Sequence, residues 1–384
     1  MSPDASPHSF GSIYAKNSFL PFEIVSIIAA YLYASHSALK ACALTCRLWH
    51  EAIHQHRFCQ VLVSRDSQLQ DLLQYLESGT VLPHWVQEIV STVPPQRMLL
   101  KMINLAPHLP RLHTLEFRGL QRDAPVDRTA ITKVFSQFGT VDTLRFRRSQ
   151  LSLSLIQSAA CALPNLAYLE LEQGGFPDEG GPLIPLSKHD QLRLISLRVE
   201  KTQQCAKFYK WIAHTESLST LRSFSVDGVD SMERLKESSE FIRTVGGSLE
   251  HLALVARRPR IDVFREQTYK ATMEHISLES NSNLRKLEIH DPLHPGITRW
   301  LDQLPFPGLL QTIVLHMPSR DVNSGYAELD KHLTKSEFSG LTEVHVKYLR
   351  ALRPCDFDMI MQDLQSGFPS VTNRGLLRLT IAHL

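Results

Sequence analysis

The sequence predicts an α/β solenoid, in which short parallel strands form one sheet, helices lie on its outer side, and a small helical unit precedes it. Two observations support this prediction. One short apolar pattern recurs along most of the 384 residues, whereas the N-terminal region lacks that pattern and holds apolar residues at helical spacing. A chain of this length is too long for one small core and suits two domains or an elongated array.

The repeated pattern is an apolar residue, two variable residues, an apolar residue, one variable residue and a last apolar residue. It occurs at 112–117, 141–146, 166–171, 221–226, 249–254, 284–289, 310–315, 341–346 and 376–381, and 192–199 fits it in either of two registers. With Leu197 as the centre of that copy and Leu379 as the centre of the last, successive centres lie 25 to 35 residues apart. The alternation predicts short strands with every second side chain buried.

Helices are predicted between the strands. Most copies follow a stretch such as LPNL, GGSL or NSNL, and Gly, Asn and Pro end helices because they tolerate or force a non-helical backbone. Upstream of these stretches, apolar residues recur at helical spacing. Four such stripes are Leu155, Ile156, Ala159, Ala160 and Leu163; Ile297, Trp300, Leu301 and Leu304; Tyr326, Leu329 and Leu333; and Phe357, Ile360, Met361 and Leu364.

The array is expected to begin before the first clear copy, because 61–63, 69–76 and 85–93 fit two further degenerate units. This gives ten to twelve units, and the unit resembles the leucine-rich repeat. The resemblance implies a parallel sheet on the concave side and helices outside. That family usually has Asn or Cys three residues after the second strand leucine. An irregular solenoid is therefore expected, because the chain has there Leu120, Ser149, Gly174, Thr202, Val229, Arg257, Pro292, Pro318 and Leu349.

The N-terminal region predicts short amphipathic helices. One apolar stripe comprises Leu20, Ile24, Ile27, Ile28, Tyr31 and Leu32, and a second comprises Leu39, Cys42, Cys46, Trp49 and Ile53. Pro21 suits a first helical turn and Glu23 suits the positive end of the helix dipole. About 35 residues are too few to hold a core alone. The helices therefore either cap the array or bury apolar surface against another protein.

The stretches LPFEIVSIIAAYL, from 20 to 32, and LKACALTCRLWHEAI, from 39 to 53, resemble an F-box. The resemblance covers 19–58, with Thr45 at a position where many members have valine. The anchors that match in register are Leu20, Pro21, Glu23, Ile24, Ile28, Leu32, Leu44, Cys46, Arg47 and Trp49. The HRF stretch at 56–58 also resembles fungal members of the family, in which the box runs directly into repeats.

Three parts are therefore expected: a disordered tail at 1–17, where the sequence is polar and rich in Pro and Ser, a three-helix F-box at 18–58 and the solenoid at 59–384. The resemblance implies that the box binds a Skp adaptor and, through it, a cullin, while the solenoid binds a target protein for ubiquitination. The adaptor-facing residues would be Leu20, Pro21, Ile24, Ile28, Leu32, Leu44, Cys46 and Trp49. The chain would then be a non-catalytic substrate-recognition subunit of a ubiquitin ligase. The alternative is a scaffold whose N-terminal helices only cap the array.

A target-binding surface is predicted on the variable strand positions, which point to the concave side. Candidate residues there are Arg118, Arg145, Arg147, Glu170, Glu172, His290, His316 and Lys347. Such a mosaic suits a polar protein surface better than nucleic acid, which favours net positive charge. These residues are equally typical of a solvated sheet face. The formal net charge of +2 likewise indicates no nucleic-acid partner.

No catalytic, cofactor or metal motif is present, so no enzyme activity or cofactor is expected. Cys42 and Cys46 lack a second pair at zinc spacing, and His54 and His56 are expected to be solvated. The stretches 173–182 and 257–260 are expected to be surface loops. No apolar run of about 20 residues predicts a membrane span. Six scattered cysteines indicate reduced thiols, hence the cytosol or nucleus.

Overall fold

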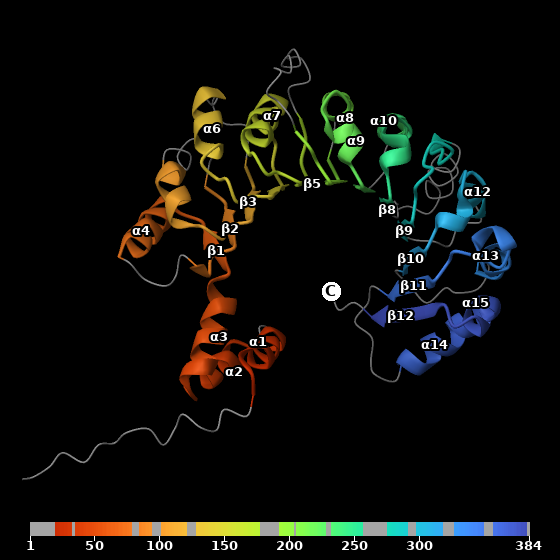
Figure 1. Ribbon diagram of the computed structural model, residues 1–384, viewed down its shortest axis with the longest axis horizontal. Helices are drawn as coiled ribbons and strands as arrows, with labels where there is room; N and C mark the ends of the chain where they lie inside the picture. The colour runs from red at the N-terminus through yellow and green to blue at the C-terminus, as the bar shows by residue number, and fades with distance from the viewer. Residues whose placement is uncertain are drawn as a thin grey trace, which may run out of the picture.

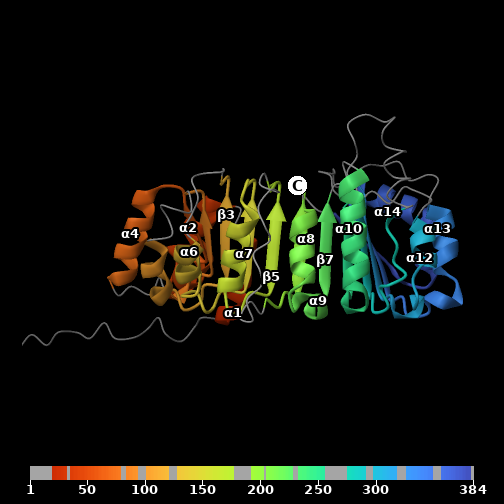
Figure 2. The same cartoon turned by 90° about the horizontal axis from the view of Figure 1, so that it is seen from above.

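The computed structural model forms an arc of strands and helices (Figure 1). The structure describes residues 20–32, 35–78, 84–93, 101–120, 128–176, 192–202, 205–227, 232–255, 275–290, 297–317, 326–348 and 356–381. Twelve strands form one sheet, and each strand pairs with the strands before and after it in the sequence. All the pairings are parallel, so the strands point to the same end of the molecule (Figure 2).

The strands line the inner, concave side of the arc (Figure 1). They are β1 (Gln60–Val63), β2 (Glu88–Ser91), β3 (Thr114–Arg118), β4 (Thr143–Arg147), β5 (Tyr168–Glu172), β6 (Ser196–Glu200), β7 (Ser223–Asp227), β8 (His251–Val255), β9 (Lys286–His290), β10 (Thr312–Met317), β11 (Glu343–Tyr348) and β12 (Leu377–Ile381). Every predicted copy of the pattern is a strand, and β1 and β2 confirm that the array begins before the first clear copy.

Helices lie on the outer side of the arc (Figure 1). Those of the array are α4 (Asp66–Glu77), α6 (Arg128–Phe135), α7 (Leu153–Ala162), α8 (Ala206–Ala213), α9 (Ser217–Thr220), α10 (Met232–Val245), α12 (Ile297–Asp302), α13 (Tyr326–Leu333), α14 (Asp356–Gly367) and α15 (Pro369–Asn373). Short 3-10 turns add η2 (Ala106–His108), η3 (Gly246–Ser248), η4 (Pro307–Leu309) and η5 (Ser336–Phe338). Three more helices precede β1: α1 (Phe22–Tyr31), α2 (His36–Ala43) and α3 (Arg47–Phe58).

The core of the array lies between the sheet and the outer helices. Central strand residues stack in register, as Leu115 pairs with Leu144 and Leu144 with Leu169, and all three are buried. The last unit differs from the prediction, because Val344 pairs with Leu377 and not with Leu379. A shift of two residues keeps the same side chains on the same face of a strand. The apolar pattern alone therefore could not fix this register.

The predicted helical stripes face this core. Buried members are Ile156, Ala159, Ala160 and Leu163 at α7; Ile297, Trp300, Leu301 and Leu304 at α12; Tyr326, Leu329 and Leu333 in α13; and Ile360 and Leu364 in α14. Leu155 and Met361 are half-buried, and the side chain of Phe357 lies outside the described part of the structure. The segment 257–260 also lies outside the described residues.

Two hydroxyl side chains replace the Asn or Cys that leucine-rich repeats usually place after the strand. The Ser149 hydroxyl accepts a hydrogen bond from the Leu120 amide (3.2 Å) and donates to the Arg147 carbonyl (2.9 Å). The Thr202 hydroxyl lies 3.3 Å from the Leu171 carbonyl oxygen, to which it donates. Both residues are buried. At these two positions a hydroxyl group therefore forms a polar ladder between neighbouring turns where the family usually has Asn or Cys.

A second polar ladder runs along the other end of the strands. Its members lie four residues before the central strand residue, and each donates to a backbone carbonyl of the preceding unit. The donors are Thr140 to Leu112 (2.7 Å), Asn165 to Gly139 (2.5 Å), Thr220 to Leu194 (2.8 Å), Ser248 to Leu218 (3.0 Å) and Asn283 to Gly247 (2.5 Å). Buried carbonyls need such donors, so this ladder joins neighbouring turns of an irregular solenoid.

Helices α1 to α3 have a small core of their own. Ala29, Leu39 and Ile53 form a buried cluster that is separate from the core of the array. The unit adjoins the array where α3 runs into β1 (Figure 1). In the described part of the chain, no helix has the length and apolar character needed to cross a bilayer.

Candidate protein-interaction surfaces

The three N-terminal helices are defined by local backbone signals. Pro21 is the residue before α1, and its carbonyl accepts from the amides of Ile24 (3.1 Å) and Val25 (3.2 Å). Ser35 caps α2 by accepting from the Ala38 amide. Cys46 has an extended backbone and begins α3. The second predicted stripe is therefore split between α2 and α3 by a turn.

Most of the first predicted stripe is on the outside of the unit formed by α1 to α3. The buried side chains of this helix are Val25 and Ala29, which sequence reasoning did not single out. Both are fully buried, whereas Ile24, Ile27 and Tyr31 are 41%, 53% and 85% exposed. A narrow stripe of small residues is enough to pack α1 on α3, so the wider apolar stripe is left facing solvent.

The predicted adaptor-facing residues divide into two groups. Leu20, Pro21, Ile24, Leu44 and Cys46 are exposed, and Leu44 is 80% exposed although it is strongly apolar. Ile28, Leu32 and Trp49 are half-buried, and the last two pack against the small core. We define the exposed apolar face by five side chains, which are Leu20, Ile24, Ile27, Tyr31 and Leu44. Exposed apolar patches of this kind mark interaction sites on soluble proteins.

His54 and His56 of α3, predicted to be solvated, are half-buried and make contacts within the unit. His56 Nε2 donates to the Ser26 carbonyl oxygen (2.8 Å) and so ties α3 to α1. The His54 ring lies 4.0 Å from the His50 ring and 5.9 Å from the Trp85 ring. Burial lowers the pKa of His54, and the neighbouring His50 and Arg57 lower it further.

Aromatic contacts join this unit to the first turn of the array. Phe58 at the end of α3 stacks on Trp85, with ring centroids 6.4 Å apart, and His54 lies beside both rings. Trp85 lies three residues before β2. These ring contacts fix α3 against the first turn of the array. Ala29 of α1 and Leu39 of α2 belong to the small cluster and not to the core of the array.

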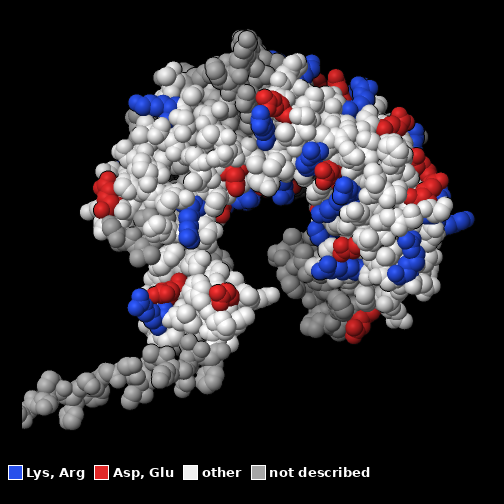
Figure 3. Space-filling view, viewed as in Figure 1, with Lys and Arg blue, Asp and Glu red and all other residues white. Residues whose placement is uncertain are grey.

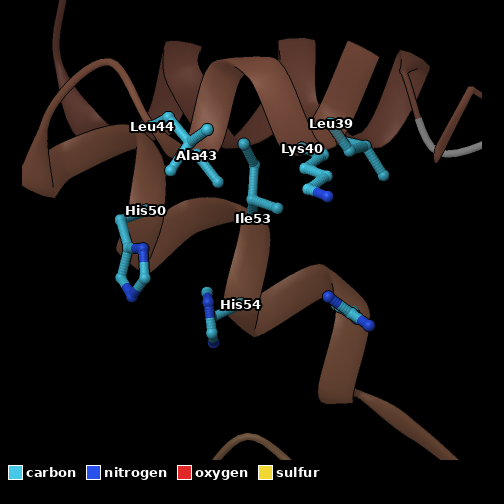
Figure 4. Close-up of a pocket in the computed structure, with 8 residues that line it drawn as sticks. Leu39, Lys40, Ala43, Leu44, His50, Ile53 and His54 are labelled. Atoms are coloured by element: carbon cyan, nitrogen blue, oxygen red, sulfur yellow. The ribbon is translucent and has the colours of Figure 1, made fainter. Parts of the chain in front are cut away.

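A groove of about 420 Å³ lies between α2 and α3 (Figure 4). Leu39, Ala43, Leu44 and Ile53 supply apolar walls. The other lining residues are Lys40, His50, His54 and Arg57, so the groove has no acidic side chain in its lining. Leu44 lines this groove and is also part of the exposed apolar face.

The concave side of β2 to β6 carries a ladder of ion pairs, both within strands and between them. Arg145 lies 3.3 Å from Glu88 and 3.1 Å from Glu170. Arg147 lies 3.2 Å from Glu172 and 3.5 Å from Glu116, which also pairs with Arg118. Arg198 pairs with Glu200 at 2.6 Å. Guanidinium groups thus alternate with carboxylates across five strands, which is favourable for opposite charges on adjacent strands.

The charges of this ladder influence one another. Burial acts to lower the pKa of Arg198, but Glu200, Glu170 and Glu172 raise it, and the net shift is upward. Glu116 is buried, with a carboxylate held by two arginines. Figure 3 shows charged side chains along the inner rim of the arc. Most arginines and glutamates of this ladder are therefore neutralised by one another.

The concave side of β8 to β12 has a different pattern, centred on Glu288. His316 Nε2 lies 2.6 Å from the Glu288 carboxylate, Lys286 Nζ 3.5 Å, His251 Nε2 3.6 Å and Lys347 Nζ 3.9 Å. Cationic and histidine side chains from four strands thus converge on one carboxylate.

The predicted target-binding residues fall into these two regions. Arg118, Arg145, Arg147, Glu170 and Glu172 belong to the ion-pair ladder, and His316 and Lys347 belong to the region around Glu288. His290 is in β9, but its side chain lies outside the described part of the structure. Sequence reasoning missed Glu288 and Glu116 as the centres of these networks, although both occupy strand positions with variable residues.

Within the described residues, no three side chains of His, Cys, Asp or Glu gather closely enough to hold a metal ion. The described part of the Gly-rich stretch at 173–182 begins directly after β5, where a Cβ at Gly174 would lie 2.6 Å from the Ser149 carbonyl oxygen. Glycine is required there by close packing of neighbouring turns.

Comparison with known proteins adds little to this description. No protein-family model matches the chain, and no curated protein matches it in sequence. The structure is similar to a chain in the crystal structure of the Rad7 and Elc1 complex of yeast, with 10% sequence identity and a TM-score of 0.38. The match covers 94% of this chain and 92% of that chain. A likeness of this size does not bear on function.

Proposed function

We propose that this chain is a non-catalytic substrate-recognition subunit of a Skp–cullin–F-box ubiquitin ligase. In this role α1 to α3 bind the Skp adaptor, which links the chain to a cullin, and the concave side of the array binds the target protein. One observation carries the proposal. Leu20, Ile24 and Leu44 are exposed apolar side chains at positions where the sequence resembles an F-box.

The separate cores favour this role over that of a cap. A capping unit buries the last apolar layer of a solenoid, so its side chains join the core of the array. Here the cluster of Ala29, Leu39 and Ile53 is distinct from the array core. The outward stripe of α1 leaves Tyr31 and Ile27 exposed to solvent. These helices have the apolar surface of a docking unit.

The test is capture of the full-length chain by a purified Skp adaptor. We expect Ile24→Asp combined with Leu44→Asp to weaken capture by at least about tenfold, because two apolar contacts are lost and two charges are buried. Both side chains are exposed, so the fold should survive, as circular dichroism would verify. Trp49 is a poorer choice, because it packs against the small core.

The matched control is Phe306→Asp combined with Leu309→Asp. These two side chains are 60% and 44% exposed on the array, far along the chain from the docking helices. The control should leave capture unchanged. Absence of capture by the wild-type chain, or an equal loss in the control, would refute the proposed adaptor binding.

A further inference from the structure

We propose that the concave side of β8 to β12 binds an acidic segment of a protein partner. This inference rests on the proposed function in one respect: the protein partner is taken to be the target protein of the ligase. The concave side of β2 to β6 does not share the role. The two halves of the sheet differ in how their charges are paired, and that difference carries the proposal.

The first step concerns Glu288, whose single carboxylate is shared by two lysines and two histidines. It faces Lys286 and Lys347 at 3.5 and 3.9 Å and His251 and His316 at 3.6 and 2.6 Å. A carboxylate has two oxygens, whereas each ammonium group has three donors. The two lysines therefore retain donor capacity that a second carboxylate would use.

The second step concerns Glu343 on β11, which is separated from β9 by β10. Arg378 lies 3.4 Å from this carboxylate and His345 lies 3.8 Å from it. The Arg378 side chain is 68% exposed, so most of its guanidinium group faces solvent. Arginine binds carboxylates with two parallel hydrogen bonds when the partner approaches in plane.

The third step compares the charges of the two halves on their described concave side chains. Across β8 to β12, the three permanent cations outnumber the two carboxylates; these residues are Lys286, Lys347, Arg378, Glu288 and Glu343. Across β2 to β6, the five carboxylates outnumber the four arginines; these are Glu88, Glu116, Glu170, Glu172, Glu200, Arg118, Arg145, Arg147 and Arg198.

An acidic segment is therefore attracted to one half of the sheet and repelled by the other. In β2 to β6, Arg145 and Arg147 each already lie between two carboxylates. The small excess of positive charge in β8 to β12 also favours carboxylates of a protein over nucleic acid, whose backbone requires many cations in a row.

Histidines make this half of the sheet more cationic at low pH. His316 faces Glu288 and pairs in register with Lys347, and His251 faces Glu288 and the Ser223 hydroxyl. His345 faces Glu343, Arg378, Lys347, His316 and the Thr380 hydroxyl. Burial lowers the pKa of His345, so this ring gains its proton only in moderately acidic solution, where it adds positive charge beside the bound carboxylates. Binding of an acidic segment should therefore strengthen as the pH falls into that range, while the carboxylates of the segment remain ionised.

The experiment measures fluorescence anisotropy of a labelled poly-L-glutamate peptide with the full-length chain. We expect binding at low salt that strengthens on acidification and weakens with added salt. Lys347→Glu combined with Arg378→Glu should weaken it by at least about tenfold. The matched control, Lys210→Glu combined with Arg243→Glu, makes the same charge change at exposed positions of α8 and α10 and should bind as the wild type does.

Three results would overturn the proposal: no binding of poly-L-glutamate, an equal loss in both double variants, or tighter binding of a single-stranded RNA of equal charge. Capture by the Skp adaptor is measured on the same variants. Lys347→Glu with Arg378→Glu should leave adaptor capture unchanged, because both residues are in the array. Loss of adaptor binding and loss of acidic-segment binding are thus separate outcomes.

Discussion

Glu116 is the most buried charge of the concave ladder. Its side chain is 1% exposed, and it faces Arg118 and Arg147, which are partly open to solvent. A buried carboxylate is tolerated only when it is paired and hydrogen-bonded. The position therefore depends on both arginines, and Arg147 in turn also faces Glu172.

Glu116→Gln should destabilise the array by about 1–3 kcal/mol, because a buried neutral amide replaces the carboxylate that carries the charge opposite Arg118 and Arg147. Urea unfolding of the full chain measures the change. Glu216→Gln is the control, since Glu216 pairs with Arg193 at an exposed site and should change stability by less than about 1 kcal/mol. Equal losses of stability in the two variants would show that the burial of Glu116 does not add to the cost of removing its charge.

His332 gives the array a dependence on pH. Burial lowers its pKa, Asp302 raises it, Lys335 lowers it and Glu337 raises it, with a net downward shift. The unfolded chain therefore binds this proton more readily than the folded chain, so the stabilising contribution is present above about pH 6.5 and is lost as the pH falls below that value. His54 and His345 shift in the same direction.

His332→Gln should reduce the loss of stability between about pH 7.5 and pH 5.5, compared with the wild type. Asp302→Asn should enlarge that loss, because it removes the nearest group that favours the protonated ring, 3.2 Å away. Urea midpoints at the two pH values measure both effects. A pH dependence identical in all three proteins would show that His332 does not contribute.

At the scale of elements, the strands could be predicted from the sequence and their connections could not. Alternating apolar residues set the faces of β3 to β11, because every second side chain of a strand points to one side. The same alternation leaves a shift of two residues undetected, as at Leu377. The ladder roles of Ser149 and Thr202 depend on turn conformations that the strand pattern does not specify.

The N-terminal helices show the same limit. Helical spacing identified an apolar stripe on α1, but spacing cannot tell which apolar side chains face inward. Val25 and Ala29 pack inside because small side chains allow close contact between helices, whereas Ile24 and Tyr31 remain outside. The resemblance therefore indicated a binding role for part of the exposed apolar face, and the structure shows which of its side chains are exposed.

Gly340 is a point where two turns of the array touch through their backbones. A methyl group at this position would overlap the Gly308 carbonyl oxygen, so the chain would have to shift. Gly340→Ala should destabilise the array by more than about 2 kcal/mol. Gly308→Ala is the matched control, because its added Cβ would lie 3.5 Å from the Glu337 carbonyl oxygen in ordinary contact. Equal urea midpoints for the two variants would contradict this close approach.

At the scale of the molecule, the two cores predict that the array folds without the N-terminal helices. A chain limited to residues 59–384 should be soluble and should unfold cooperatively, losing only the stability that the contacts of His54 and Phe58 with Trp85 contribute. Size-exclusion chromatography and circular dichroism measure this. A cap would give the opposite result, because its removal would leave the first apolar layer of the array in water and cause aggregation.

One polar ladder of the array bears on its evolution by gain or loss of repeats. Its donors are Thr140, Asn165, Thr220, Ser248 and Asn283. Each of these side chains donates to the unit directly before it. Duplication or deletion of a whole unit therefore brings together a donor and a carbonyl that already fit one another. The array can lengthen or shorten by entire units, and so alter the span of its concave surface, while the docking helices stay unchanged.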